Sequence, residues 1–163
     1  MATRRICEFL DGSNARYVLV HHSPAFTAQE IAESSHIPGR FMAKAVVVRI
    51  DSVLALAVVP ASCDVSLALL RQEAAADQVR LADEDEFADR FEGCQIGTAP
   101  PFGNLFGIPT YVDSSFSDED EIAFNAGTHT DLIVMRFKDY RRIVRPTRAT
   151  ISLASRRRPA ALV

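Results

Sequence analysis

Two strongly apolar segments, rich in β-branched residues, dominate the middle of the chain. They cover residues 45–50 and 53–59, and only Asp51 and Ser52 separate them. Continuous apolar runs of this length are typical of strands buried on both faces, and a short polar break between two such runs is typical of a hairpin. The pattern therefore predicts a β-hairpin at the centre of the core.

Two helices are predicted before this hairpin. Apolar residues repeat at helical spacing over residues 4–10, and Gly12 is a suitable terminator for that helix. Thr27 followed by Glu30 matches a capping box, which predicts a second helix that stops before Pro38.

Further elements are predicted after the hairpin. Asp64 is a candidate N-cap for a helix over residues 67–70, and Asp83 is one for a helix that contains residues 87–91 and ends at Gly93. Short strands are predicted at residues 17–20, 110–112, 121–124 and 131–137, and a brief last helix at 139–143.

These elements show neither strict strand–helix alternation nor a repeat, which favours an α+β fold over a doubly wound sheet. A length of 163 residues, 48% of them hydrophobic, suffices for a single domain. The longest apolar run, residues 53–61, is too short for a membrane span, and residues 1–11 lack the apolar region of a secretory signal. We therefore expect a soluble, cytoplasmic protein with no membrane partner.

Charge is distributed unevenly along the chain. Residues 1–135 hold 9 Lys/Arg and 20 Asp/Glu, a balance of −11, whereas residues 136–163 hold 9 Lys/Arg and one Asp, a balance of +8. A basic segment can bind a polyanion through its phosphates, or it can simply aid solubility. Residues 147–163 lack periodicity, so we expect a basic, flexible tail after a domain that spans residues 1–146.

The three cysteines, Cys7, Cys63 and Cys94, are widely spaced and have no histidine at metal-ligand spacing. This pattern favours three reduced thiols over a disulfide framework, and it predicts no metal site.

Lys44 is the first candidate for chemistry. It stands at the start of the first hairpin strand, after Met42 and Ala43 and before an apolar run at 45–48. A strand-end lysine can simply extend its side chain to water. Alternatively, a cleft can hold its ammonium to bind a phosphate or polarise an ester carbonyl.

A loop predicted at residues 97–109 is the second candidate, because its three glycines and three prolines preclude a helix or central strand. Glycine lets backbone N–H groups point at an oxyanion or phosphate, but the same composition also suits an ordinary rigid turn. The loop residues of interest are Gly97, Thr98, Ala99, Pro100, Pro101, Phe102 and Gly103.

Polar residues at strand ends are weaker candidates. Asn125, Gly127 and His129 lie between two predicted strands, where His129 can act as an acid, a base or a donor. Asp113 follows another strand and can orient a partner or cap a turn. No serine lies in a nucleophile-elbow motif and no cysteine has a predictable histidine partner, which favours non-covalent chemistry.

Lys44, the 97–103 loop, residues 108–113 and residues 121–127 occur in the order and at the spacing of one known family. On these motifs the chain resembles the YbaK/prolyl-tRNA-synthetase-associated domain family over roughly residues 15–146. The resemblance implies a single α+β domain with a mixed, barrel-like sheet flanked by helices, and no metal or other cofactor.

The resemblance also implies a function, namely removal of a wrong small amino acid (Ala, Ser, Thr or Cys) from mischarged tRNA in trans. Lys44 is then required for deacylation, and residues 97–101 shape the pocket around the aminoacyl ester. Water, or a hydroxyl of the terminal ribose, is the expected attacking group. An aminoacyl-tRNA synthetase is a further candidate partner, and the oligomeric state is left open.

Positioning and oxyanion stabilisation can suffice for this reaction because an aminoacyl ester is already activated. Two alternatives stay open: a non-catalytic module that binds tRNA or a synthetase, and a hydrolase of a small ester or amide unrelated to tRNA. Candidate pocket-wall residues, each equally an ordinary core residue, are Met42, Val46, Leu56 and Phe102.

Overall fold

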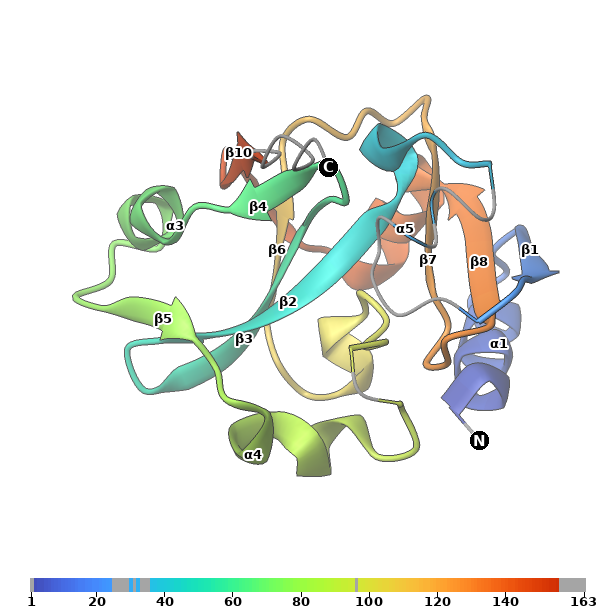
Figure 1. The fold of residues 1–163 in the computed structure, drawn as a ribbon, viewed down its shortest axis with the longest axis horizontal. Helices are drawn as coiled ribbons and strands as arrows, with labels where there is room; N and C mark the ends of the chain where they lie inside the picture. The colour runs from blue at the N-terminus through green and yellow to red at the C-terminus, as the bar shows by residue number, and fades with distance from the viewer. Residues whose placement is uncertain (1, 25–29, 31, 33–35, 96, 156–163) are drawn as a thin grey trace, which may run out of the picture.

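The computed structural model describes residues 2–24, 30, 32, 36–95 and 97–155 (Figure 1). Its helices are α1 (Ala2–Gly12), α3 (Leu67–Glu73), α4 (Glu84–Phe87) and α5 (Phe137–Val144), with short 3₁₀ turns η1 (Gly39–Phe41), η2 (Ala88–Phe91) and η3 (Gly103–Leu105). Its strands are β1 (Tyr17–His21), β2 (Ala43–Ile50), β3 (Val53–Pro60), β4 (Cys63–Val65), β5 (Val79–Leu81), β6 (Thr110–Asp113), β7 (Glu121–Asn125), β8 (Asp131–Arg136), β9 (Thr147–Ala149) and β10 (Ser152–Ala154).

The predicted hairpin is confirmed and forms the centre of the fold. Strands β2 and β3 pair antiparallel along their whole length, from Ala43 opposite Pro60 to Ile50 opposite Val53. Asp51 takes a positive φ of 51° at the turn, a conformation that Asp tolerates better than most residues. Seven of the eight residues of β3 are buried, as its continuous apolar run predicts.

The strands are arranged in one mixed five-stranded sheet and two smaller antiparallel sheets. The large sheet has the order β5-β2-β3-β6-β9, in which β6 runs parallel to β3 and to β9. A three-stranded sheet, β1-β8-β7, meets the large one at a parallel bridge between Met42 and Ala123. A two-stranded sheet pairs β10 with β4. The α+β fold is thus confirmed, whereas the described strands do not close into a barrel.

Apolar side chains fill both faces of this arrangement. On one face, α1 and α5 contribute Ile6, Leu10 and Tyr140 to a cluster with Phe124 of β7 and Phe102 of the glycine-rich loop. On the other face, Leu70 of α3 packs over alternate residues of β2 and β3, and a smaller cluster gathers around Met42. The helices therefore cover both sides of the hairpin.

Two local expectations are wrong in detail. The N-cap of α3 is Ser66, whose Oγ accepts a 3.2 Å hydrogen bond from the N–H of Leu69, because Asp64 is held within β4. Asn14, and not Gly12, takes the left-handed conformation after α1. The second predicted helix, from Thr27, lies largely outside the described residues.

The expected tail also begins too early. Residues 147–154 form β9 and β10, which pair with β6 and β4 respectively, and Ile151 between them is fully buried. Two neighbouring strands supply the pairing that the local sequence does not reveal. The folded domain therefore extends beyond residue 146.

Among the described helices, the longest has 11 residues, and none has the length and apolar character needed to cross a bilayer.

Candidate active site

Lys44 lies on the face of β2 that α3 covers. Its neighbours on that face, Val46 and Val48, pack in the cluster that contains Leu70. The Lys44 side chain is only 25% exposed, and its Nζ atom lies 3.5 Å from Oδ1 of Asp64 in β4. Because the Asp64 side chain is 68% exposed, the pair is weak, and an incoming anionic group can displace the carboxylate.

Asn125 shares this face with Lys44. The parallel bridge aligns Met42 with Ala123, so the next residues on the same side are Lys44 on β2 and Asn125 on β7. Packing agrees, because Met42 and Ala123 belong to one cluster while Phe124 points into the core on the opposite side. The structure thus places two of the residues that the sequence singles out on one face, two positions beyond the point where their strands meet.

A tight turn follows Asn125 and leads into β8. Gly127 has a φ of +88°, and a Cβ there would lie 2.5 Å from the Cβ of Ala2, so this position requires glycine. Thr128 Oγ1 accepts a 3.0 Å hydrogen bond from the N–H of Asp131 and donates one of 2.8 Å to its Oδ2. His21 adds a 2.9 Å contact from Nδ1 to Oδ1 of Asp131.

These contacts determine the charge state of Asp131. Burial alone would raise the pKa of its carboxyl group, but the hydrogen bonds from His21, Thr128 and Thr3 outweigh that effect and lower the pKa. Asp131 is therefore an ionised anchor for the turn.

The glycine-rich loop lies next to this turn. Gly97 has a φ of +77°, and a Cβ at this position would meet no other atom. The backbone conformation, and not crowding, therefore favours glycine here.

Some backbone N–H groups of the 97–103 loop already donate hydrogen bonds within the protein. The N–H of Thr98 donates to the carbonyl of Gln95, and that of Gly103 donates to Thr110 Oγ1. In the described part of the chain, the N–H groups of Gly97 and Ala99 have no acceptor, so they are the donors open to a ligand.

The second half of the loop is built into the core. Tyr140 donates a 2.6 Å hydrogen bond from its hydroxyl to the carbonyl of Pro101. The Phe102 ring is fully buried and makes edge contacts with two other rings. Its centroid lies 5.2 Å from that of Phe124 and 5.5 Å from that of Tyr140. Gly103 is required because a Cβ would lie 2.2 Å from Thr110 Oγ1. The 97–103 loop therefore has a rigid base.

Gln95 connects the loop to the turn, and no pattern in the sequence pointed to it. Its N–H donates to the carbonyl of Gly127 at 2.9 Å, and its side-chain Oε1 accepts from the N–H of His129 at 2.7 Å. Its own carbonyl accepts from both the N–H and the Oγ1 of Thr98. Asp64, the partner of Lys44, is a second residue whose role the sequence did not indicate.

Asp113 lies apart from these residues. It follows Val112, which aligns with Val58 of β3, so Asp113 is two strands, or about 10 Å, from Lys44. Its Oδ1 accepts a 3.0 Å hydrogen bond from the N–H of Ile151, and its Oδ2 accepts one of 3.2 Å from the N–H of Ser115. These contacts give Asp113 a structural role at the end of β6.

The predicted wall residues do not line one pocket. Met42 and Val46 flank Lys44 on its own face. Leu56 is aligned with Val47 on the opposite face, and Phe102 is buried in the core there. Only Met42 and Val46 are therefore positioned to contact a group bound at Lys44.

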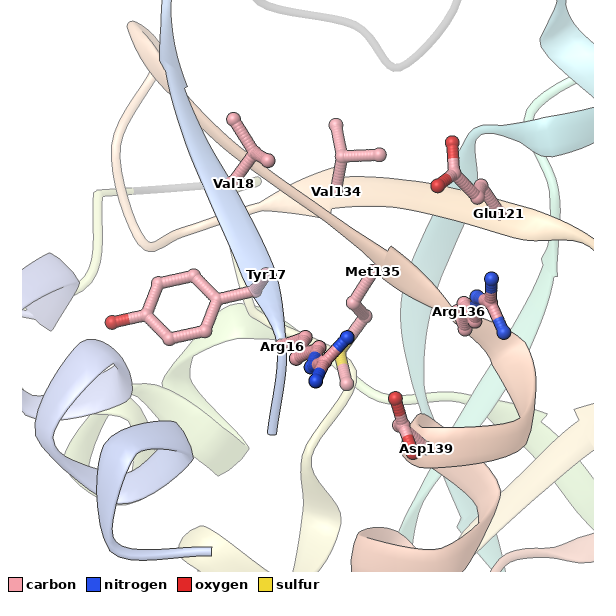
Figure 2. A pocket seen from close by; sticks show the side chains of 8 residues that line it. All are labelled: Arg16, Tyr17, Val18, Glu121, Val134, Met135, Arg136 and Asp139. Carbon is pink, nitrogen blue, oxygen red and sulfur yellow. The ribbon is translucent and has the colours of Figure 1, made fainter. Parts of the chain in front are cut away.

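A separate cavity of about 620 Å³ opens at the other end of β7 (Figure 2). Figure 2 shows Arg16, Arg136 and Asp139 close together around it, with Val18 and Val134 along one side. None of the site residues predicted from the sequence lines it. From Glu121 at this end, β7 runs about 14 Å to Asn125.

The structure is thus a small α+β domain that holds a partly buried lysine at the start of its central hairpin and also contains a rigid glycine-rich loop. The family model described as an aminoacyl-tRNA editing domain matches residues 22–143. The chain belongs to this family, as its motifs suggest, and is an aminoacyl-tRNA deacylase by class.

Individual relatives agree with this assignment. The chain is 27% identical over 148 residues to the Multifunctional Ser/Thr-tRNA deacylase ProXp-y of Escherichia coli strain K12, and the match covers 88% of each chain. The protein of the same name from E. coli O157:H7 matches equally well.

Solved structures show the same fold. A hypothetical protein superposes with a TM-score of 0.81 at 18% identity, covering 91% of this chain and 99% of its own. A candidate trans-editing enzyme for prolyl tRNA synthetase superposes with a TM-score of 0.78 at 21% identity, covering 94% and 98% respectively.

Proposed function

We propose that this protein hydrolyses, in trans, the ester bond of tRNA mischarged with a small amino acid. Seryl and threonyl esters are the leading substrates, because the E. coli relative is a Ser/Thr-tRNA deacylase. Alanyl and cysteinyl esters are the further candidates. The proposed setting is the cytoplasm, with a synthetase such as that for proline as a candidate partner.

One observation carries the mechanism: a partly buried ammonium lies at the end of a strand, and the carboxylate paired with it is exposed and replaceable. The Lys44 ammonium can bind the ester carbonyl oxygen after displacing Asp64, and the N–H groups of Gly97 and Ala99 can share the charge that develops there. Asn125, Gly127 and His129 are the further residues that we assign to the border of this site.

The reaction needs no group from the protein to act as a nucleophile. Water adds to the ester carbonyl carbon, the bond from that carbon to the ribose oxygen breaks, and the amino acid leaves from a tRNA that regains its hydroxyl. A hydroxyl of the terminal ribose is well placed to assist the water, because the ester joins the same sugar. Held in this geometry, an activated ester reacts without further catalytic groups.

Exclusion by size gives limited selectivity. Met42 and Val46 can restrict the side chain of the substrate, but one methylene changes binding by only about 1 to 3 kcal/mol. Preference for serine or threonine over alanine therefore requires a polar contact in addition to a wall.

Deacylation of a panel of mischarged tRNAs tests this proposal. We expect release of serine and threonine by the unmodified protein and at least a hundredfold slower release by Lys44→Met, which keeps the length of the side chain but removes the ammonium. Asp64→Asn is the matched control, because it removes the ion pair and leaves Lys44 in place.

Three results would contradict the proposal. Full activity of a folded Lys44→Met variant would remove the lysine from the mechanism. Salt-sensitive tRNA binding without hydrolysis of any panel member would favour a tRNA-binding module instead, and hydrolysis that uncharged tRNA does not inhibit would favour a small-ester hydrolase.

A further inference from the structure

The side-chain amide oxygen of Asn125 is buried without a hydrogen-bond partner among the described residues. The residue is only 8% exposed, and no donor reaches its Oδ1 atom. Buried amides in native proteins are nearly always paired, because an unpaired polar group gives up its hydrogen bonds to water and gains nothing in return. An exception of this kind calls for a physical reason.

The position of this amide points to the substrate. Asn125 shares a face with Lys44 through the alignment of Met42 with Ala123, and it is the last residue of β7 before the turn that Gln95 ties to the 97–103 loop. An unpaired group in the core far from any site would be a defect. On the face that carries Lys44, it can serve as a preformed contact for a ligand.

The chemistry of the amide defines what it can bind. An amide presents an acceptor oxygen and two donor hydrogens, so it complements a group that both donates and accepts, such as a hydroxyl. Serine and threonine carry such a hydroxyl, alanine has none, and a cysteine thiol is a poor hydrogen-bonding partner.

We infer that the Asn125 amide binds the side-chain hydroxyl of a seryl or threonyl substrate and thereby sets the preference for hydroxyl amino acids. This inference rests on the proposed deacylase function. The contact supplies what size exclusion lacks, because a site built to bind a hydroxyl strongly rejects an analogue without one. Asn125 is thus a specificity residue, and Lys44 is the residue that stabilises the reacting ester.

The test compares three substrates that share one tRNA body, charged with serine, threonine or alanine. Asn125→Leu keeps the approximate shape of the side chain and removes both amide functions. We expect kcat/KM for the seryl and threonyl substrates to fall roughly tenfold to a hundredfold, with the alanyl value within about twofold of that of the unmodified protein. Asn125→Ala, in which no larger side chain must fit, should show the same selective loss.

Stability separates this role from a structural one. Because the amide oxygen has no partner within the described part of the chain, Asn125→Leu should unfold at the same temperature as the unmodified protein or higher. Asn104→Leu is the matched control: Asn104 is exposed, its Nδ2 donates to the carbonyl of Ile143, and the variant should keep the ratio of seryl to alanyl rates.

The possible outcomes are distinct. An equal loss on all three substrates would overturn the inference, because alanine has no side-chain hydroxyl for the Asn125 amide to bind. Unchanged rates for the seryl and threonyl substrates would overturn it as well. If the unmodified protein hydrolysed none of the three esters, the deacylase proposal would fail and this inference with it.

Discussion

The side-chain Oε1 of Gln95 accepts a 2.7 Å hydrogen bond from the backbone N–H of His129. This contact joins two segments 34 residues apart in the sequence, the approach to the 97–103 loop and the turn after β7. With the bond from Gln95 N–H to the carbonyl of Gly127, it fixes the 97–103 loop and the turn after β7 relative to each other. The precision of the proposed site therefore depends on a residue outside the recognised motifs.

Gln95→Ala should slow deacylation without unfolding the protein. Loss of one hydrogen bond of about 1 kcal/mol corresponds to a fall in kcat of roughly fivefold to tenfold. KM should change little, because Gln95 positions the loops and does not itself contact tRNA. Stopped-flow or quench assays under single turnover measure this directly.

Gln95→Glu provides the decisive comparison, because a carboxylate oxygen can still accept from His129. It should recover most of the activity. Gln72→Ala, at an exposed position of α3, is the matched control and should behave like the unmodified protein. Equal losses in Gln95→Ala and Gln95→Glu would show that the acceptor at this position is unimportant.

Asp113→Ala should destabilise the fold. The substitution leaves the buried N–H of Ile151 without an acceptor, which costs about 2 to 3 kcal/mol in the free energy of unfolding. Urea denaturation measures the loss, and Asp113→Asn, which retains one acceptor oxygen, should lose less. A stable but inactive Asp113→Ala variant would instead indicate a direct role in the reaction.

The local pattern of the chain predicted most of its elements. The β2–β3 hairpin, the strands β6 to β8 and the helix α5 follow from apolar runs and periodicity, because those signals are local. Gly97 and Lys44 were recognisable as candidates for the same reason, since each stands out from its immediate neighbours.

What the pattern missed depends on long-range contacts. Strand β9 is too short to show periodicity and owes its existence to pairing with β6. The link from Gln95 to His129 and the pair of Lys44 with Asp64 require side chains that the fold brings together. The unpaired state of the Asn125 oxygen is likewise invisible without the structure, since any asparagine in a sequence has potential partners.

Glu86 should make stability depend on acid pH. Hydrogen bonds from Arg80, from the N–H of Asp83 and from Arg49 lower the pKa of its carboxyl group to about 2. In the unfolded chain this pKa is near its ordinary value of 4.5. The stabilisation is therefore fully present above about pH 4.5 and is lost as the pH falls toward 2.

Glu86→Gln tests this dependence. At pH 7 the variant should be less stable than the unmodified protein, and the difference should shrink as the pH falls below 4.5, because protonation removes the same charge from Glu86. Urea denaturation of both proteins between pH 7 and pH 3 gives the comparison. A difference that stays constant over this range would refute the assigned pKa shift.

Truncation should separate the folded end of the chain from its basic end. A variant that stops at Pro146 lacks β9, β10 and the buried Ile151, and leaves Asp113 without one of its donors, so we expect a loss of more than about 3 kcal/mol in the free energy of unfolding. A variant that stops at Ser155 keeps every described contact and should unfold like the full chain.

The shorter deletion then isolates the arginines at positions 156–158. If these arginines bind tRNA phosphates, the variant that stops at Ser155 should bind tRNA more weakly. The slope of log affinity against log salt should also become shallower by up to about 3, because each phosphate that an arginine neutralises contributes close to one. Filter binding between low and moderate salt measures both quantities. An unchanged slope would place the tRNA-binding surface on the folded domain, where Arg16 and Arg136, which line the cavity at the Glu121 end of β7, are the next residues to replace.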